Sequence, residues 1–178
     1  MNSSNKTKTL VLAALMTGMI IVMTMIIKIP IPFTQGYVHL GDAMIFMAVL
    51  VVGWKYGAAA AGIGSALADL MLGAAMWAPW TLVVKGGMAI IMGLILKGGR
   101  ENITALRQTV AMICGGLFMV AGYYVAEGVM YGNWIAPAIG VPWNIGQFAV
   151  GGIIATILAA ALCRTSASKL FEYKMRTN

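Results

Sequence analysis

The chain is dominated by apolar segments of about 20 residues, the length that a helix needs to cross the hydrocarbon core of a bilayer. These segments fall at residues 9–27, 40–56, 57–76, 79–96, 109–130 and 143–163. Of the 178 residues, 61% are hydrophobic and only 10% are charged, which is typical of an integral membrane protein. The segments lack the period-two alternation of a membrane β-barrel. We therefore predict an all-α integral membrane protein, with residues 1–178 in a single bundle of six transmembrane helices.

The boundary between the second and third segments is short. The second segment runs almost directly into the third across Trp54-Lys55-Tyr56-Gly57, without an intervening polar loop. Two antiparallel helices joined in this way need a tight turn. We expect that turn near residues 54–57.

Basic residues predict the orientation of the bundle. Of the twelve Lys and Arg residues, Lys28 falls in an outer loop and Lys85 within a span, whereas the others fall in inner loops and tails. The positive-inside rule then places both termini in the cytoplasm. The net charge of +7 is explained by insertion and by contact with anionic lipid of the bilayer, so we expect no nucleic-acid partner.

Four charged residues interrupt the apolar segments: Asp42, Asp69, Lys85 and Glu127. A helical rise of about 1.5 Å per residue places Asp69 slightly beyond the membrane midplane and Lys85 about 9 Å below the outer surface, so we expect these two to meet. Ionisable groups at such depth usually mark a ligand path. An ion pair that only fixes helix packing is the alternative for Asp69 and Lys85. For Asp42 and Glu127, simple access to interfacial water is the alternative.

Amides and aromatic residues occupy the same outer level. Asn144 and Gln147 are three residues apart and share a helix face, and Tyr123 precedes Glu127 by one turn. A flat apolar surface beside a polar group suits a planar heterocycle. Interfacial anchoring of the aromatic residues, and hydrogen bonds between helices for the amides, remain alternatives.

The motifs expected of an enzyme or a metal protein are absent from the sequence. It contains neither a GxxxxGK[ST] phosphate loop nor HExxH, and Ser65 has no suitable histidine partner because the lone histidine, His39, lies in a loop. A metal at His39 would need further ligands that its loop does not offer. We expect no catalytic residues, no metal site and no cofactor bound by this chain.

Small residues suggest close helix contacts. Ala14 and Gly18 are one turn apart in the first segment, and residues 58–64 read AAAAGIG. Such patterns let helix backbones approach each other. We expect internal packing for the run at 58–64. Because Ala14 and Gly18 fall in the cytoplasmic half, we expect them to contact another membrane subunit.

Several motifs resemble those of one transporter family. His39-Leu-Gly-Asp42-Ala-Met-Ile-Phe, Gly62-Ile-Gly-Ser-Ala-Leu-Ala-Asp69-Leu, Trp77-Ala-Pro79-Trp-Thr81-Leu and Lys85-Gly86 look like the substrate-binding S components of energy-coupling factor (ECF) vitamin transporters. The resemblance implies a multi-pass protein of a prokaryotic plasma membrane that captures a vitamin from outside. It further implies docking on a transmembrane T subunit powered by two cytoplasmic ATPases, which use ATP and Mg.

The resemblance also implies roles for particular residues. The family contacts its T subunit through an AxxxA motif, which Ala14 and Gly18 match with one conservative departure, and it uses the loop at 28–39, including Pro30, Pro32, Gln35 and Gly36, as a lid. The chain looks most like the riboflavin-type or the hydroxymethylpyrimidine/pyridoxine-type subgroup. A small pyrimidine or pyridine alcohol is the first expected ligand and riboflavin the second. The candidate substrate-binding residues are His39, Asp42, Asp69, Trp77, Trp80, Lys85, Tyr123, Glu127, Asn144 and Gln147.

Two other functions are consistent with the same sequence. An ion-coupled or facilitative small-solute transporter would work alone, and a structural or assembly subunit would bind no ligand. Transport by the isolated chain distinguishes the first from an S component, which transports only with its partners.

Overall fold

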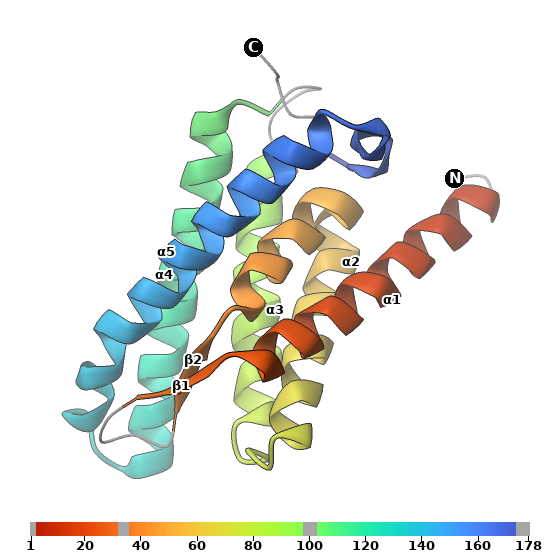
Figure 1. Cartoon of the computed structure of the whole chain (residues 1–178). Coiled ribbons are helices and arrows are strands. Elements are labelled where there is room, and N and C mark those ends of the chain that lie inside the picture. The colour runs from red at the N-terminus through yellow and green to blue at the C-terminus, as the bar shows by residue number, and fades with distance from the viewer. Residues whose placement is uncertain (1–2, 32–35, 98–102, 174–178) are drawn as a thin grey trace.

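A computed structural model describes residues 3–31, 36–97 and 103–173 of the chain. Five helices in this part are long and apolar enough to cross a membrane, which confirms the predicted helical membrane protein. They are α1 (Ser3–Ile26), α2 (Gly41–Met71), α3 (Ala78–Lys97), α4 (Ala105–Tyr131) and α5 (Ala136–Cys163) (Figure 1). The predicted lid residues Pro32 and Gln35 lie outside the described residues.

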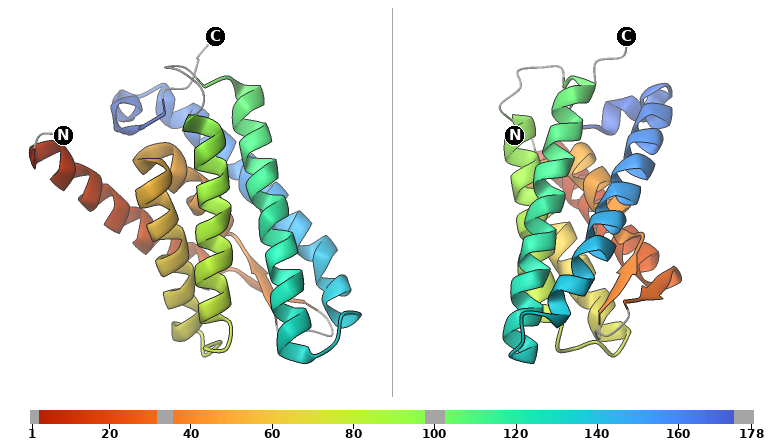
Figure 2. Two further views of the ribbon diagram at one scale, coloured as in Figure 1. Left: turned by 180° about the vertical axis from the view of Figure 1, so that it is seen from behind. Right: turned by 90° about the vertical axis from the view of Figure 1, so that its left-hand side faces the viewer.

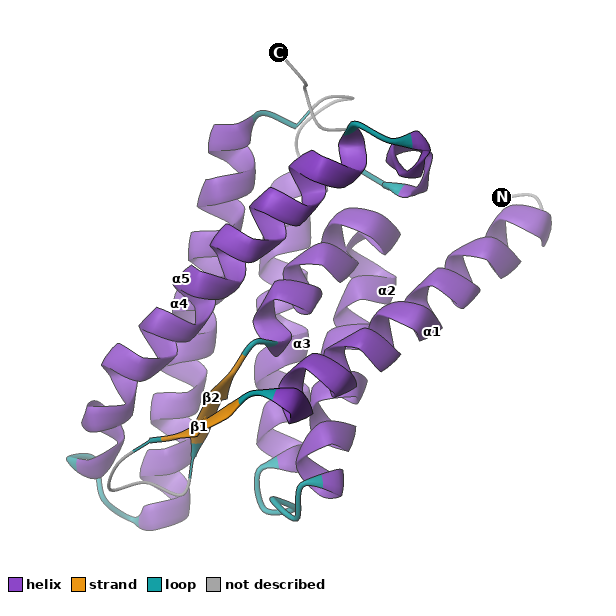
Figure 3. Cartoon of the chain, in the orientation of Figure 1, coloured by secondary structure: helices purple, strands orange, loops and turns teal. Residues whose placement is uncertain are grey.

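Two short antiparallel strands join α1 to α2. Strand β1 (Lys28–Pro30) pairs with β2 (Tyr37–His39), with Lys28 opposite His39 and Pro30 opposite Tyr37. This hairpin lies between the end of α1 and the beginning of α5 (Figure 3). It therefore occupies the position expected of the lid.

The beginning of α1 and the end of α5 lie at the same end of the bundle in each view (Figures 1 and 2). The loop between α2 and α3 lies at the opposite end. This arrangement fits two termini on one side of a membrane. That the side is cytoplasmic stays a prediction from the basic residues.

Helix α2 is broken at Gly53, whose backbone adopts φ 76° and ψ 174°. A Cβ atom placed on Gly57 would lie 2.9 Å from Val49 Cα, whereas residues eight apart in a continuous helix are separated by about 12 Å. The chain therefore reverses direction at Gly53, slightly earlier than the turn predicted at 54–57. The first segment, residues 41–52, is about 18 Å long and does not span a core of about 30 Å by itself. The count of six membrane crossings stays a prediction.

The end of that first segment is capped by the C-terminal part of the chain. After the 3-10 helix η1 (Ser166–Leu170), the Glu172 backbone N–H lies 3.1 Å from Leu50 O and 3.0 Å from Val51 O. The Tyr173 hydroxyl donates to Gly93 O on α3 at 3.2 Å. The Glu172 N–H thus reaches carbonyl groups that the break leaves without helical partners, while Tyr173 ties the same end of the chain to α3.

Residues 41–52 are all buried, and the other helices surround them. The second segment of α2 packs closely on its neighbours through small residues: a Cβ on Gly62 would lie 2.7 Å from Leu82 O, and one on Gly64 would lie 3.1 Å from Thr17 O. This confirms the internal packing predicted for the run at 58–64. The buried first segment begins directly after the hairpin, so it positions the hairpin and the adjacent helices around one site.

Candidate functional site

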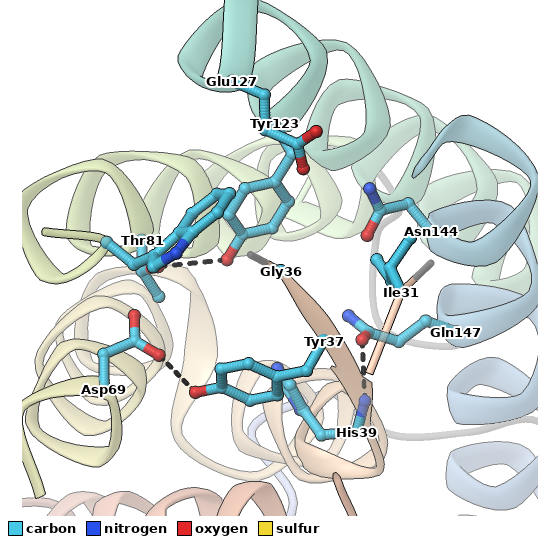
Figure 4. A pocket seen from close by; sticks show the side chains of 11 residues that line it. Ile31, Gly36, Tyr37, His39, Asp69, Thr81, Tyr123, Glu127, Asn144 and Gln147 are labelled. Carbon is cyan, nitrogen blue, oxygen red and sulfur yellow. Dashed lines mark hydrogen bonds between the residues drawn. The ribbon is translucent and has the colours of Figure 1, made fainter. Parts of the chain in front are cut away.

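A small cavity lies where the hairpin meets α2, α3, α4 and α5 (Figure 4). Its volume is about 30 Å³, which is enough for one water-sized molecule. The lining combines aromatic rings with amide, hydroxyl and carboxylate groups. It consists of Ile31, Gly36, Tyr37, His39, Asp69, Trp77, Thr81, Tyr123, Glu127, Asn144 and Gln147.

A fully buried ion pair lies behind the wall of this cavity. Lys85 Nζ on α3 donates to Asp42 Oδ1 at 2.5 Å, and both side chains have no exposed surface. Gln147 Nε2 on α5 donates to the other oxygen, Asp42 Oδ2, at 2.9 Å. Three helices are therefore joined by one carboxylate, and Lys85 already has an acidic partner behind the cavity wall.

The predicted ion pair between Lys85 and Asp69 is wrong. Counting residues along each span estimates depth, but it assumes that every span begins at the membrane surface. The hairpin instead carries the chain inward, so that α2 begins inside the bundle (Figure 1), and its Asp42 is fully buried. Asp42 thereby reaches Lys85 first, and Asp69 has a different partner.

That partner is Tyr37 of the hairpin, whose hydroxyl donates to Asp69 Oδ1 at 2.5 Å. Asp69 is 5% exposed, and its Oδ2 has no hydrogen-bond partner among the described residues. The Thr81 side chain lies near enough to stabilise the charge of this carboxylate. The hairpin is thus tied to the second segment of α2 by a single hydrogen bond directly beside the cavity.

His39 connects the hairpin to α5 and to the start of α2. Its backbone N–H donates to Gln147 Oε1 at 2.8 Å, and its Nδ1 accepts a hydrogen bond from the Gly41 N–H at 3.0 Å. Burial, assisted by the nearby Lys85 and opposed by Asp42, lowers the pKa of His39 to about 3. His39 is therefore neutral near pH 7, with its remaining proton on Nε2. Burial also raises the pKa of Tyr37, assisted by its hydrogen bond to Asp69.

Two aromatic rings form one wall of the cavity. Trp77 and Tyr123 meet edge to face, with ring centroids 6.1 Å apart and an interplanar angle of 62°. The Tyr123 hydroxyl lies 3.3 Å from Thr81 Oγ1, and Lys85 Nζ lies 5.3 Å from the Tyr123 ring centroid. Tyr123 thus separates the buried lysine from the cavity with an aromatic face.

Glu127 on α4 points into the cavity from another wall (Figure 4). Its side chain is only 2% exposed, and Oε2 has no hydrogen-bond partner among the described residues. Gly140 and Asn144 on α5 lie beside it; a Cβ on Gly140 would be 3.5 Å from Oε2 and 3.8 Å from Asn144 Nδ2. The alternative in which Glu127 simply reaches interfacial water does not describe this buried carboxylate.

The structure brings most of the predicted candidates together. Seven line the cavity: His39, Asp69, Trp77, Tyr123, Glu127, Asn144 and Gln147. Asp42 and Lys85 lie behind it, and the half-buried Trp80 is outside the lining. That these residues bind substrate stays a prediction.

Sequence reasoning missed Tyr37 and Thr81 as members of the site. Thr81 precedes Lys85 by four residues and so shares its helix face, which was an available signal. Tyr37 had no comparable signal, because a loop sequence does not show that its tyrosine folds back onto Asp69. Both follow from the packing of the hairpin against the bundle.

Ala14 and Gly18 lie in the middle of α1 and are not among the residues that line the cavity. Both are exposed, and a Cβ placed on Gly18 would meet nothing within 4 Å. This surface of α1 is open to lipid or to another protein.

Comparison with known proteins agrees with the membrane fold and with a vitamin transporter. The family model for the S component of the ECF-type riboflavin transporter matches residues 4–164. The thiamine precursor transporter HmpT of Lactococcus lactis subsp. cremoris (strain MG1363) is 30% identical over 159 residues, covering 89% of each chain. An uncharacterized protein of Pyrococcus woesei is 41% identical over 133 residues, covering 75% of this chain and 86% of its own.

A solved structure of the S component of a bacterial ECF transporter has a similar fold. Its TM-score is 0.73, with 18% sequence identity, and the match covers 89% of this chain and 97% of that one. At this identity the likeness concerns the fold alone.

Proposed function

The chain belongs to the family of S components of ECF-type transporters, and from this premise we propose that it captures a hydroxymethylpyrimidine-type thiamine precursor from outside the cell. HmpT, a relative of similar length, is a thiamine precursor transporter, which supports this ligand ahead of pyridoxine or riboflavin. The chain then docks on a T subunit, and two partner ATPases hydrolyse the ATP. The chain itself binds no cofactor and catalyses no reaction.

The observation that carries this proposal is the small cavity between the hairpin and four helices. Trp77 and Tyr123 offer apolar ring surface, while Asp69, Glu127 and Asn144 offer polar groups around it. A small pyrimidine has the same combination of a flat ring and polar substituents. Riboflavin, with three fused rings and a ribityl chain, requires a far larger rearrangement of a cavity of about 30 Å³.

Binding requires the hairpin to move, since no heterocycle fits the present volume. Tyr37 reaches the cavity from the hairpin and uses Asp69 Oδ1 as its acceptor. A ligand that donates to Asp69 Oδ1 competes with the Tyr37 hydroxyl and so releases the hairpin from α2. Ligand occupancy and hairpin position are thereby coupled, as transport with a separate motor subunit demands.

Calorimetry with the purified chain in nanodiscs tests the ligand. We expect 4-amino-5-hydroxymethyl-2-methylpyrimidine to bind more tightly than pyridoxine, and riboflavin to bind least. Glu127→Gln should weaken pyrimidine binding about 10- to 100-fold, because it removes a buried acceptor. Glu172→Gln is the matched control at the other end of the bundle and should leave affinity unchanged. Tighter binding of riboflavin than of the pyrimidine contradicts the proposed ligand.

Reconstituted vesicles test the docking surface. Gly18→Leu should abolish uptake by the complete complex and leave pyrimidine binding intact, because Leu prevents close approach of the T subunit to α1. Gly146→Leu on α5 is the matched control, since a Cβ on Gly146 also meets nothing within 4 Å. Loss of uptake in both variants argues against docking at α1. Uptake by the chain without T and ATPase subunits would instead support the stand-alone transporter.

A further inference from the structure

The charges around the cavity do not balance. Lys85, whose Nζ lies over the Tyr123 ring, is already paired with Asp42 behind the cavity wall. Asp69 and Glu127 line the cavity from α2 and α4, and no described residue forms a salt bridge with either. Residues 32–35 of the hairpin loop contain no charged side chain. Among the described residues, the cavity lining thus holds two carboxyl groups and no Lys or Arg side chain.

The one other basic residue near this end, Lys28, does not correct the imbalance. Its Nζ lies 5.2 Å from the centroid of the Tyr37 ring, and its side chain is exposed on the hairpin. It is not part of the cavity lining. His39 is neutral, and its Nδ1 is already occupied by the Gly41 N–H.

The unpartnered oxygens show what the cavity lacks. Asp69 Oδ2 and Glu127 Oε2 are both buried without a hydrogen-bond donor among the described residues. Leaving a buried acceptor unsatisfied is unfavourable, so a ligand that brings donors gains affinity at both positions. A ligand that brings a phosphate adds like charge next to ionised carboxylates, and even a protonated carboxyl group offers no compensating cation.

From this arrangement we infer that Asp69 and Glu127 form a charge filter: the cavity accepts the free, donor-bearing form of a heterocyclic vitamin or precursor and rejects its phosphate ester. The inference rests on the proposed function and adds its charge specificity. Amino, hydroxymethyl or protonated ring N–H groups satisfy the two carboxyl groups, whereas a phosphate finds none of the Lys or Arg residues that normally bind it. The ligand of such a protein is therefore an unphosphorylated precursor. If its source is phosphorylated, a phosphatase must first remove the phosphate.

Competition binding on the purified full chain tests the filter with paired ligands. The pairs are the pyrimidine alcohol, pyridoxine and riboflavin, each with its phosphate ester. Whichever free form binds, its phosphate ester should bind at least about 100-fold more weakly. Equal or tighter binding of the phosphate ester overturns the inference. If the pyrimidine alcohol does not bind, but pyridoxine binds far more tightly than its phosphate ester, the proposed ligand is contradicted. The charge filter is then still supported.

Size must be separated from charge. A neutral acetate ester of the same alcohol also enlarges the ligand but adds no charge, so it should bind at least about 10-fold more tightly than the phosphate ester. The double variant Asp69→Asn/Glu127→Gln should lower the affinity ratio between alcohol and phosphate at least about 10-fold, even though the alcohol itself binds more weakly. An acetate ester as weak as the phosphate, or an unchanged ratio in the folded double variant, shows that volume alone decides and overturns the inference.

Discussion

Helix α1 and the first segment of α2 are both strongly apolar, yet they have opposite environments. Only 11% of the residues in the most apolar stretch of α1 are buried, against 72% for α2. Residues 41–52 are surrounded by protein, while α1 exposes Leu10, Val11, Leu15 and Val22 on its outer surface. In a bilayer both environments suit apolar side chains, so hydrophobicity does not distinguish them.

The buried segment and the exposed helix also differ in what their polar and small residues contact. The buried segment carries Asp42, which joins α3 and α5 next to the candidate cavity. The exposed helix carries Ala14 and Gly18, whose contact with another subunit stays a prediction; neither residue lines the cavity. Substitutions that are severe in one element should therefore be mild in the other.

The largest difference should appear between removing Lys85, the α3 partner of Asp42 in the buried segment, and removing a charge of α1. Lys85→Met leaves Asp42 buried without its cation and should lower the free energy of unfolding by about 3–5 kcal/mol. Lys8→Met on the exposed surface of α1 should change it by less than about 0.5 kcal/mol. Unfolding by detergent titration measures both. The double variant Asp42→Asn/Lys85→Met should recover part of the loss, and a double variant less stable than Lys85→Met would contradict this account of the pair.

A smaller difference should appear between two glycines. Gly57→Ala places a Cβ 2.9 Å from the Val49 backbone and should destabilise the protein by about 1–3 kcal/mol. Gly18→Ala meets nothing within 4 Å and should be neutral or slightly stabilising. Thermal unfolding in the same detergent compares them. Equal destabilisation by Gly57→Ala and Gly18→Ala would contradict the claim that α2 is closely packed at Gly57 while α1 is open at Gly18.

The smallest expected effect concerns pH. The folded-state pKa of His39, about 3, lies below its usual value of about 6.5, so below pH 6.5 the unfolded chain binds a proton that the folded chain does not. Its contribution to stability is complete above pH 6.5 and decreases as the pH falls toward 3. Between pH 7.5 and 5.5 the loss should be about 1 kcal/mol more in the native chain than in His39→Asn. The exposed α1 contains no histidine and provides no such dependence; an identical pH profile in both proteins would refute the burial of a neutral His39.

Much of the site could be predicted because its chemistry is exceptional for a membrane segment. Asp42, Asp69, Lys85 and Glu127 are conspicuous among apolar residues, and their approximate depth follows from helical rise. Their partners could not be predicted, since depth does not fix the direction in which each side chain points. Lys85 met Asp42 rather than Asp69 because the hairpin moves the start of α2 into the bundle.

The amino-acid sequence determined the membrane fold, the family and the chemical types of the candidate residues, because apolar length and rare embedded charges are local properties of a chain. Tertiary structure alone decided that Gly53 reverses α2, that Tyr37 reaches Asp69 and that Glu127 is enclosed. Each of these depends on contacts between residues distant in the chain. The same structure decided which of two apolar helices is buried, because lipid and protein interior are equally favourable surroundings for the side chains of both.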